Sequence, residues 1–317
     1  MTAIAALTLP LGLSCASTQA PTPTSGPSTP QPSDSPAAIL PEAAARVAFD
    51  RLTRYPDPGW QVPRGVGFSP DGAFATFLQS ETGSATMSLW GADMATGAVF
   101  VYVRPGDLPS GRALSPEEEL RRERQRTRIE GITDARWASR AELLVLPAGG
   151  DVFVATGKPG GPDGKPALER LTDTPAAELD PKPCPSGGWV GYVRDGDVHA
   201  FDLGGRREVR LTPGGPEGTT RGLSDFNAQE EFDEPSGFFW APDCARIAYL
   251  EVDERGVDEV PVIGYRRAGP AARMDQRYPR AGRPNPKVRL RLVDVGDKPK
   301  DRAVELPAAL GSDPYLT

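Results

Sequence analysis

Short hydrophobic strands separated by turn residues dominate the chain from residue 65 onward. A recurring pattern marks four segments, residues 65–79, 132–147, 179–203 and 237–253. Each copy places an aromatic or apolar strand before a turn rich in Pro, Asp, Gly or Ser, and a second apolar strand follows. The pairs Asp71-Gly72 and Gly187-Gly188 supply the positive φ values that tight hairpin turns need.

The spacing of this pattern predicts the architecture. Copies separated by roughly 45 to 65 residues fit the blades of a β-propeller, in which each four-stranded sheet buries its faces against its neighbours. We therefore expect an all-β fold, a partial β-propeller of four-stranded blades that occupies residues 39–317. A β-sandwich is the structural alternative, but it gives no reason for the pattern to recur.

One charged segment interrupts the strands. Residues 115–131 read SPEEELRRERQRTRIEG, with Ser115 as an N-cap, Pro116 at the first helical position and three glutamates in the first turn. Five arginines follow in its second half. The segment predicts an Arg-rich helix inserted in a propeller loop, and by itself it reads as a solvated surface helix.

Composition narrows the functional classes. The 317 residues carry a net charge of -7, which argues against nucleic acid as the main partner. The single histidine, His199, lies in a strand-like segment where a structural role is expected, and three cysteines do not suffice for a multi-ligand Cys/His metal site. No cofactor motif is visible, so we expect no cofactor. Spacing leaves open whether Cys184 and Cys244 form a disulfide.

The first 38 residues suggest export. Residues 1–15 form an apolar run that ends in small residues and a cysteine, which predicts a signal peptide with a lipobox-like site and lipidation at Cys15. Residues 16–38, rich in Pro, Ser and Thr, then form a tether to a bacterial envelope membrane. A tail with a chance cysteine is the alternative, because no Lys or Arg precedes the apolar run.

The candidate chemistry lies in residues 225–243, DFNAQEEFDEPSGFFWAPD. Glu230 and Glu231 are adjacent and flanked by aromatic residues, which suggests a partly desolvated wall. Two carboxylates held together there repel each other and need a cation. A free peptide amino terminus fits, since an ammonium offers three donors, and an arginine of the 115–131 segment would hold a carbonyl or carboxylate of the same ligand.

These segments resemble a known family. Its landmarks in this chain, in order, are LSPEEELRRERQR, DPKPCP, AQEEFDEPSGFFWAPD, DERGVDEV and RYPRAGRPNPKVRL. They are similar to the N-terminal β-propeller of the dipeptidyl peptidase IV family, in the prolyl oligopeptidase clan of serine peptidases. The resemblance covers roughly residues 40 to 317. It implies an eight-bladed propeller followed by an α/β-hydrolase domain with a Ser/Asp/His triad.

The resemblance also implies site residues. Glu230 and Glu231 match the pair that binds the substrate's amino terminus, so that cleavage releases a dipeptide, preferentially after proline or alanine. Arg126 matches the arginine that contacts the substrate backbone, and a shifted register would give Arg124 or Arg122 instead. The sequence contains no G-x-S-x-G nucleophile motif. We therefore expect no catalytic residue in this chain, an incomplete propeller, and no peptide hydrolysis by this chain alone.

Two functional hypotheses follow. The first is the substrate-binding propeller of a secreted or lipid-anchored serine dipeptidyl peptidase, whose partners are peptides with a free amino terminus and a C-terminal hydrolase domain. A homodimer of the complete protein is a further expectation from the family. The second is a non-catalytic envelope propeller that binds peptides or proteins.

Overall fold

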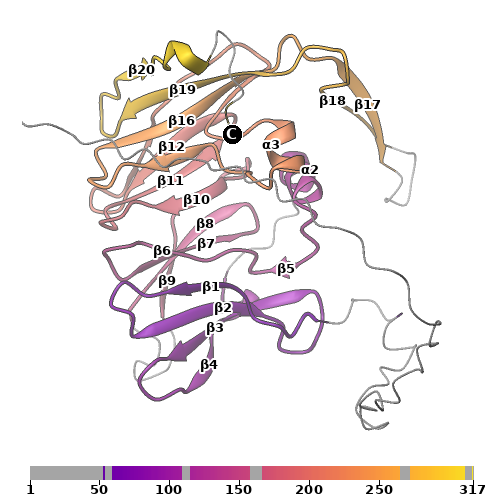
Figure 1. The fold of residues 1–317 in the computed structure, drawn as a ribbon. Helices are drawn as coiled ribbons and strands as arrows, with labels where there is room; N and C mark the ends of the chain where they lie inside the picture. Colours follow the sequence, from indigo (N-terminus) through magenta and orange to yellow (C-terminus); the bar gives the residue numbers. More distant parts are fainter. Residues whose placement is uncertain are drawn as a thin grey trace, which may run out of the picture. The chain divides into compact units, whose positions relative to one another are not determined.

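A computed structural model describes residues 59–108, 115–157, 166–264 and 272–310, together with Thr53 and Leu316. The signal-like segment, Cys15 and the tether lie outside the described residues. The described part contains four sheets of four or five mostly antiparallel strands that follow one another along the chain, and a separate two-stranded sheet (Figure 1). Each of the four recurring sequence segments contributes at least two neighbouring strands of one sheet, which confirms the prediction of a partial β-propeller of four-stranded blades.

The first and second sheets are simple meanders. The first sheet contains β1 (Arg64–Phe68), β2 (Phe74–Gln79), β3 (Thr86–Asp93) and β4 (Val99–Val103). The short strand β5 (Glu130–Gly131) pairs with β3 in parallel. The second sheet contains β6 (Arg136–Trp137), β7 (Leu143–Ala148), β8 (Asp151–Thr156) and β9 (Ala167–Arg170).

The third sheet repeats the meander and the fourth carries additions. The third contains β10 (Leu179–Pro183), β11 (Trp189–Arg194), β12 (Asp197–Asp202) and β13 (Arg207–Arg210). The fourth contains β14 (Thr219–Arg221), β15 (Phe238–Trp240), β16 (Arg246–Asp253), β19 (Lys287–Asp294) and β20 (Asp301–Ala303). A hairpin of β17 (Glu259–Gly264) and β18 (Ala272–Arg277) is inserted between β16 and β19.

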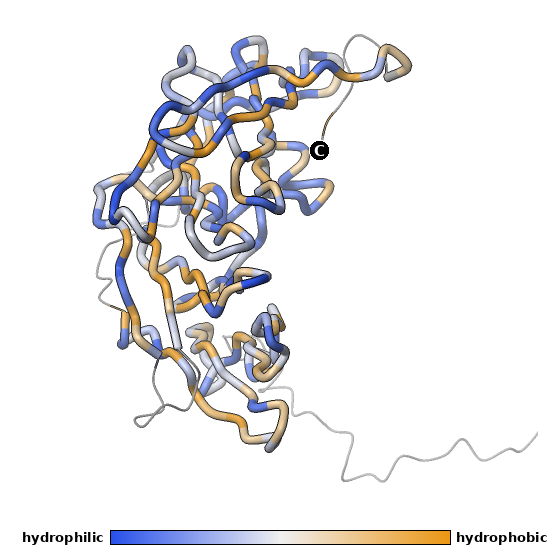
Figure 2. The backbone as a smooth tube through the Cα atoms, turned by 90° about the vertical axis from the view of Figure 1, so that its left-hand side faces the viewer, coloured by the Kyte–Doolittle hydropathy of each residue, from blue (hydrophilic) through white to orange (hydrophobic). Residues whose placement is uncertain are grey.

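Three buried hydrophobic clusters hold successive sheets together. In β7, Leu144 and Leu146 pack toward the first sheet, while Val145 packs toward Val190 and Tyr192 of the third. This alternation follows from the strand period of two, which sends neighbouring side chains to opposite faces. A third cluster joins the third and fourth sheets. Figure 2 shows short hydrophobic and hydrophilic stretches alternating along the backbone.

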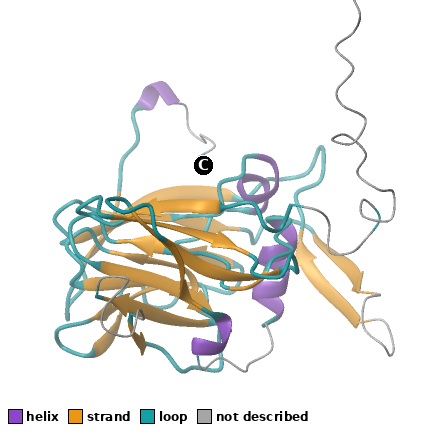
Figure 3. Ribbon diagram, turned by 90° about the horizontal axis from the view of Figure 1, so that it is seen from below, coloured by secondary structure: helices purple, strands orange, loops and turns teal. Residues whose placement is uncertain are grey.

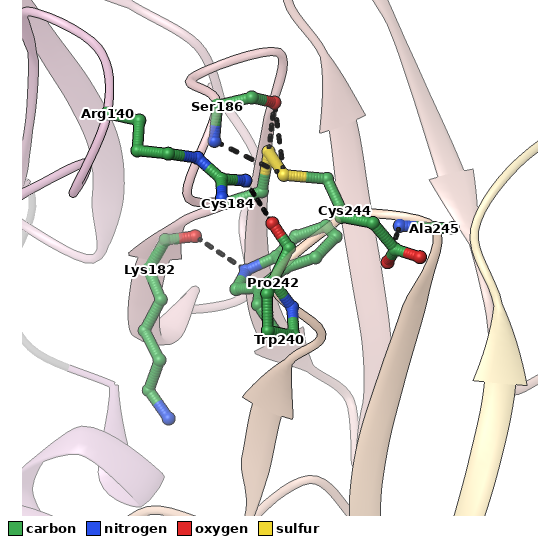
Figure 4. Close-up of a disulfide and its surroundings, with 9 residues drawn as sticks. Arg140, Lys182, Cys184, Ser186, Trp240, Pro242, Cys244 and Ala245 are labelled. Atoms are coloured by element: carbon green, nitrogen blue, oxygen red, sulfur yellow. Dashed lines mark hydrogen bonds between the residues drawn. A yellow bond between two sulfur atoms is a disulfide. The ribbon is translucent and has the colours of Figure 1, made fainter.

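A disulfide joins the third and fourth sheets, which settles the pairing that the sequence left open. Cys184 follows β10, Cys244 lies in the turn between β15 and β16, and their Cα atoms are 5.6 Å apart (Figure 4). Nearby, the Trp240 indole N–H donates to the carbonyl of Lys182 at 3.2 Å. The bond therefore connects two sheets that also share a hydrophobic cluster.

His199 has structural partners, in agreement with its expected role. It lies in β12, is 5% exposed and stacks on Tyr192 with ring centroids 5.8 Å apart. Its Nδ1 lies 2.9 Å from Glu208 Oε1, and Tyr192 and Arg194 also donate to Glu208. Burial raises the pKa of the Glu208 carboxyl, but the hydrogen bonds from these three side chains outweigh it and hold the pKa at about 2.

The described part also contains four helices. Three of them are short: η1 (Pro105–Asp107), α3 (Phe226–Glu231) and η2 (Ala308–Leu310). The helix α2 (Pro116–Arg124) is longer and contacts α3. Figure 3 shows α2 and α3 side by side at the edge of the sheets, although more than 100 residues separate them in sequence. None of the helices in the described part is long and apolar enough to cross a membrane.

Candidate functional site

The helix α2 carries the arginines of the candidate peptide-binding site, and α3 carries Glu230 and Glu231. Its N-cap Ser115 accepts a hydrogen bond from the Glu118 backbone N–H at 3.2 Å, as the sequence predicts. The prediction of a helix through residue 131 is wrong, since α2 ends at Arg124. Arg126 adopts a left-handed φ of 50°, which no α-helix continues, and β5 follows on the first sheet.

The helix α2 is also not a solvated surface helix. The side chain of Arg121 is 19% exposed and that of Arg122 is 22% exposed. Burial lowers the pKa of the Arg121 guanidinium, and the nearby carboxylate of Asp180 opposes this effect. Ion pairs that are shielded from water in this way are stronger than those of a solvated helix, and both arginines have such partners, Asp180 and Glu118.

The helix α3 carries the two glutamates. Its N-cap Asp225 accepts a hydrogen bond from the Ala228 backbone N–H at 2.9 Å. The buried Gln229 side chain donates to the carbonyl of Ser224 at 2.7 Å, which fixes the inner face of the helix. Glu230 is half-buried on this helix, whereas Glu231 at its last position is exposed. The expectation of a desolvated wall therefore holds for Glu230 and is wrong for Glu231.

Arg124 is the arginine of α2 that the structure brings to the glutamates. Its guanidinium carbon lies 5.2 Å from the ring centroid of Phe226 on α3. Burial lowers its pKa, while the carboxylates of Glu254, Glu230 and Asp225 oppose that shift through their negative charge. Arg124 thus lies against α3 on a partly apolar surface.

The other two predicted arginines lie elsewhere. Arg126 is exposed, and its backbone N–H donates to the carbonyl of Glu123. Arg122 pairs with Glu118 on its own helix at 3.1 Å. Of the three candidate arginines, Arg124 is the one whose pKa responds to the negative charge of Glu230 and whose guanidinium lies over Phe226 of α3. The binding roles of Arg126, Glu230 and Glu231 stay predictions.

Two further residues border this site and were not predicted from the sequence. Burial raises the pKa of the Glu254 carboxyl, and Arg124 opposes this shift with its positive charge. Tyr278, which follows β18, packs edge-on against Phe226 with ring centroids 4.8 Å apart. Both belong to sequence landmarks, DERGVDEV and RYPRAGRPNP, but no local pattern shows that these segments meet α3.

A third unpredicted residue, Asp180, contacts the helix α2 from β10. Its carboxylate is fully buried and pairs with cations from three elements: Arg121 of α2, Arg136 of β6 and Lys182 of β10. The segment DPKPCP contains both Asp180 and Lys182 but gives no sign of Arg121 and Arg136, which are distant in sequence.

Two cavities flank α2. One of about 330 Å³ is lined by Arg121, Arg136 and Asp180 among others. The second, of about 360 Å³, lies between α2, α3 and the third sheet, and Arg124 and Gln229 contribute to its walls. Cavities of this size are at the lower end of those that hold small ligands. No cluster of three metal-ligating side chains occurs within the described ranges.

Comparison with known proteins identifies the fold. A family profile for the dipeptidyl peptidase IV N-terminal region matches residues 162–317. Dipeptidyl peptidase 8 of Homo sapiens is 30% identical over 218 residues, which cover 61% of this chain and 24% of that protein. Residues 162–317 belong to the N-terminal region of the dipeptidyl peptidase IV family. The venom dipeptidyl peptidase 4 of Vespa velutina is 33% identical over 141 residues, 40% of this chain and 18% of that protein.

A solved structure supports the same fold for the dipeptidyl peptidase IV region. Dipeptidyl peptidase 4 of Porphyromonas gingivalis superposes with a TM-score of 0.55 at 21% sequence identity. The match covers 77% of this chain and 33% of that protein. The matched curated relatives are much longer than this chain, which spans 24% of dipeptidyl peptidase 8.

Proposed function

We propose that this chain is the substrate-binding part of a dipeptidyl peptidase and that Glu230 and Glu231 hold the substrate's free amino terminus. The observation that carries the proposal is the excess of carboxylates beside α3. The carboxylates of Glu254, Glu230 and Asp225 all act on the Arg124 guanidinium, and a second guanidinium, that of Arg277, acts on Glu254. With the neighbouring Glu231, this surface favours a further cation.

A peptide ammonium supplies that cation. It has three donors, so it can bind both glutamates at once, and each charge-assisted bond contributes about 1.5–3 kcal/mol. Arg124 offers a planar set of donors to a carbonyl or carboxylate of the same peptide. When the amino terminus is held at this point, only the bond after the second residue lies at the right distance for cleavage, and cleavage there releases a dipeptide.

Hydrolysis itself needs a nucleophile, a base and an oxyanion hole. Under this proposal an α/β-hydrolase domain with a Ser/Asp/His triad acts on the peptide that this chain holds, after proline or alanine at the second position. The names of the relatives in the comparison support a peptidase of this family.

The disulfide supports an oxidising location. Disulfides persist in secreted proteins and in the bacterial periplasm and are rare in the cytosol, and Cys184 and Cys244 are bonded. We therefore place the protein in the cell envelope, secreted or anchored through Cys15. A homodimer of the complete protein belongs to the same proposal.

Peptide binding to the full chain tests the proposal. A Gly-Pro-Ala peptide with a free amino terminus should bind at least 100-fold more tightly than its N-acetylated form, as measured by isothermal titration calorimetry. Combining Glu230→Gln with Glu231→Gln should abolish this preference, because two bonds to the ammonium lose their charge assistance, at about 3 kcal/mol or more in total.

Glu305→Gln is the matched control, since Glu305 is an exposed carboxylate that follows β20. It should bind both peptides as the unmodified chain does. Equal affinity for the free and acetylated peptides in the unmodified chain would refute the proposal. It would then favour the second candidate, a propeller that binds other surfaces of peptides or proteins.

A further inference from the structure

Asp180 adopts an unusual backbone conformation within β10. Its φ of 53° lies in the left-handed region, which non-glycine residues rarely adopt. The register between β10 and β11 shifts at the same place, since Leu179 pairs with Val193 but Lys182 pairs with Gly191. One extra residue in β10 forms this bulge, and bulges redirect side chains that a regular strand would point elsewhere.

The carboxylate of Asp180 is 0% exposed and forms ion pairs with three cations. Its Oδ1 lies 3.0 Å from Arg136 and 3.7 Å from Arg121, and its Oδ2 lies 3.0 Å from the Lys182 ammonium. The Ser236 hydroxyl also donates to Oδ2 at 2.7 Å. A single buried carboxylate with so many partners is costly to lose, because the cations would be left without a counter-charge.

Two of these partners, Arg121 and Ser236, belong to the segments that carry the candidate peptide site. Arg121 lies on α2 one turn before Arg124, so its ion pair fixes the helix that carries the guanidinium beside Glu230. Ser236 pairs with Leu223 in an isolated β-bridge, which closes the loop that carries α3. The carboxylate therefore contacts the helix α2 and the base of the α3 loop at once.

We propose that Asp180 is a positioning residue for the peptide site: through Arg121 and Ser236 it sets the placement of Arg124 relative to Glu230. The inference rests on the proposed function. Asp180 does not touch the peptide. The left-handed backbone and the bulge in β10 place one carboxylate where it contacts both α2 and the base of the α3 loop.

Four variants test this role in the full chain. Asp180→Asn keeps the shape and tolerates a positive φ but removes the charge, so it should raise the Kd for the Gly-Pro-Ala peptide at least tenfold. Arg121→Met releases α2 alone and Ser236→Ala releases the α3 loop alone, and each should raise the Kd about threefold or more. Arg121→Lys, which keeps the charge, should recover most of the loss.

The control is Asp151→Asn. Asp151 is a buried carboxylate of the second sheet that pairs with Arg170 at 2.6 Å, without a contact to Asp180 or to either helix among the described contacts. This variant should lower the melting temperature but leave the Kd unchanged. In the background of Glu230→Gln with Glu231→Gln, Asp180→Asn should raise the Kd by a smaller factor than in the unmodified chain, because only the contact of Arg124 with the peptide is left to disturb.

The outcomes separate this inference from the proposed function. If the unmodified chain fails to distinguish free from acetylated peptide, the proposed function is refuted and the positioning role falls with it. If the chain distinguishes them but Asp180→Asn binds as tightly as the unmodified chain, the positioning role alone is refuted. If Asp180→Asn does not fold, Arg121→Met and Ser236→Ala decide, and unchanged affinity in both refutes the role.

Discussion

Removal of the Cys184–Cys244 bond tests how firmly the third and fourth sheets are held together. The bond closes a loop with a sequence separation of 60 residues. In the chain-entropy treatment a loop of that length restricts the unfolded chain by about 14 cal/mol/K, or about 4 kcal/mol at 25 °C. Replacing both cysteines by alanine should therefore lower the free energy of unfolding by about 4 kcal/mol.

Urea unfolding followed by far-ultraviolet circular dichroism measures this change. With a slope of about 2 to 3 kcal/mol/M, the midpoint of the double variant should fall by about 1.5 to 2 M. The unmodified chain in a reducing agent is the control, and it should unfold at the midpoint of the variant. An equal midpoint for the variant and the oxidised chain would refute the reasoning, since the third cluster would then hold the two sheets without the bond.

Three further predictions concern stability. Glu208→Gln should make the free energy of unfolding less sensitive to acid. Burial raises the pKa of the Glu208 carboxyl, but its hydrogen bonds lower the pKa from 4.5 to about 2. The stability that the ionised carboxylate contributes is therefore present at neutral pH and is lost as the pH falls through that range. Thermal melts of both proteins between pH 6 and pH 2 measure this, and parallel curves would contradict it. Gly237→Ala should cost more than about 2 kcal/mol in urea unfolding, because a Cβ there would lie 2.6 Å from the carbonyl oxygen of Leu223; a cost below 0.5 kcal/mol would show that the loop yields. Asp225→Ala should cost about 1 kcal/mol through loss of the cap to Ala228, whereas Asp225→Ser should retain most of the stability in the same assay.

The strands were predictable because their signals are local. Gly72 and Gly187 have the positive φ values that their turns require, 68° and 75°. The end of α2 was not predictable in the same way, since the charged pattern continues past Arg124 and no residue there is a strong stop signal. The backbone of Arg126 turns into the left-handed region instead.

The sequence predicts which types of residue form the candidate site, but not which side chains contact one another there. Glu230 and the arginines of α2 stand out as charged groups in the sequence, and a resemblance to a family linked them. The role of Asp180 depends on Arg121 and Arg136, which precede it by more than 40 residues, and on Ser236, which follows it by 56. A single sequence carries no record of such contacts between distant positions.

The serial arrangement of the three hydrophobic clusters has a consequence for synthesis. Each cluster joins a sheet to the next one along the chain, so each can form as soon as that next sheet has been made. The pair of α2 and α3 is different, because α2 is made before the second sheet and α3 only as the fourth begins. Peptide recognition under our proposal therefore arises late in biogenesis, and a nascent chain that stops after the third sheet holds Arg124 without its glutamate partner.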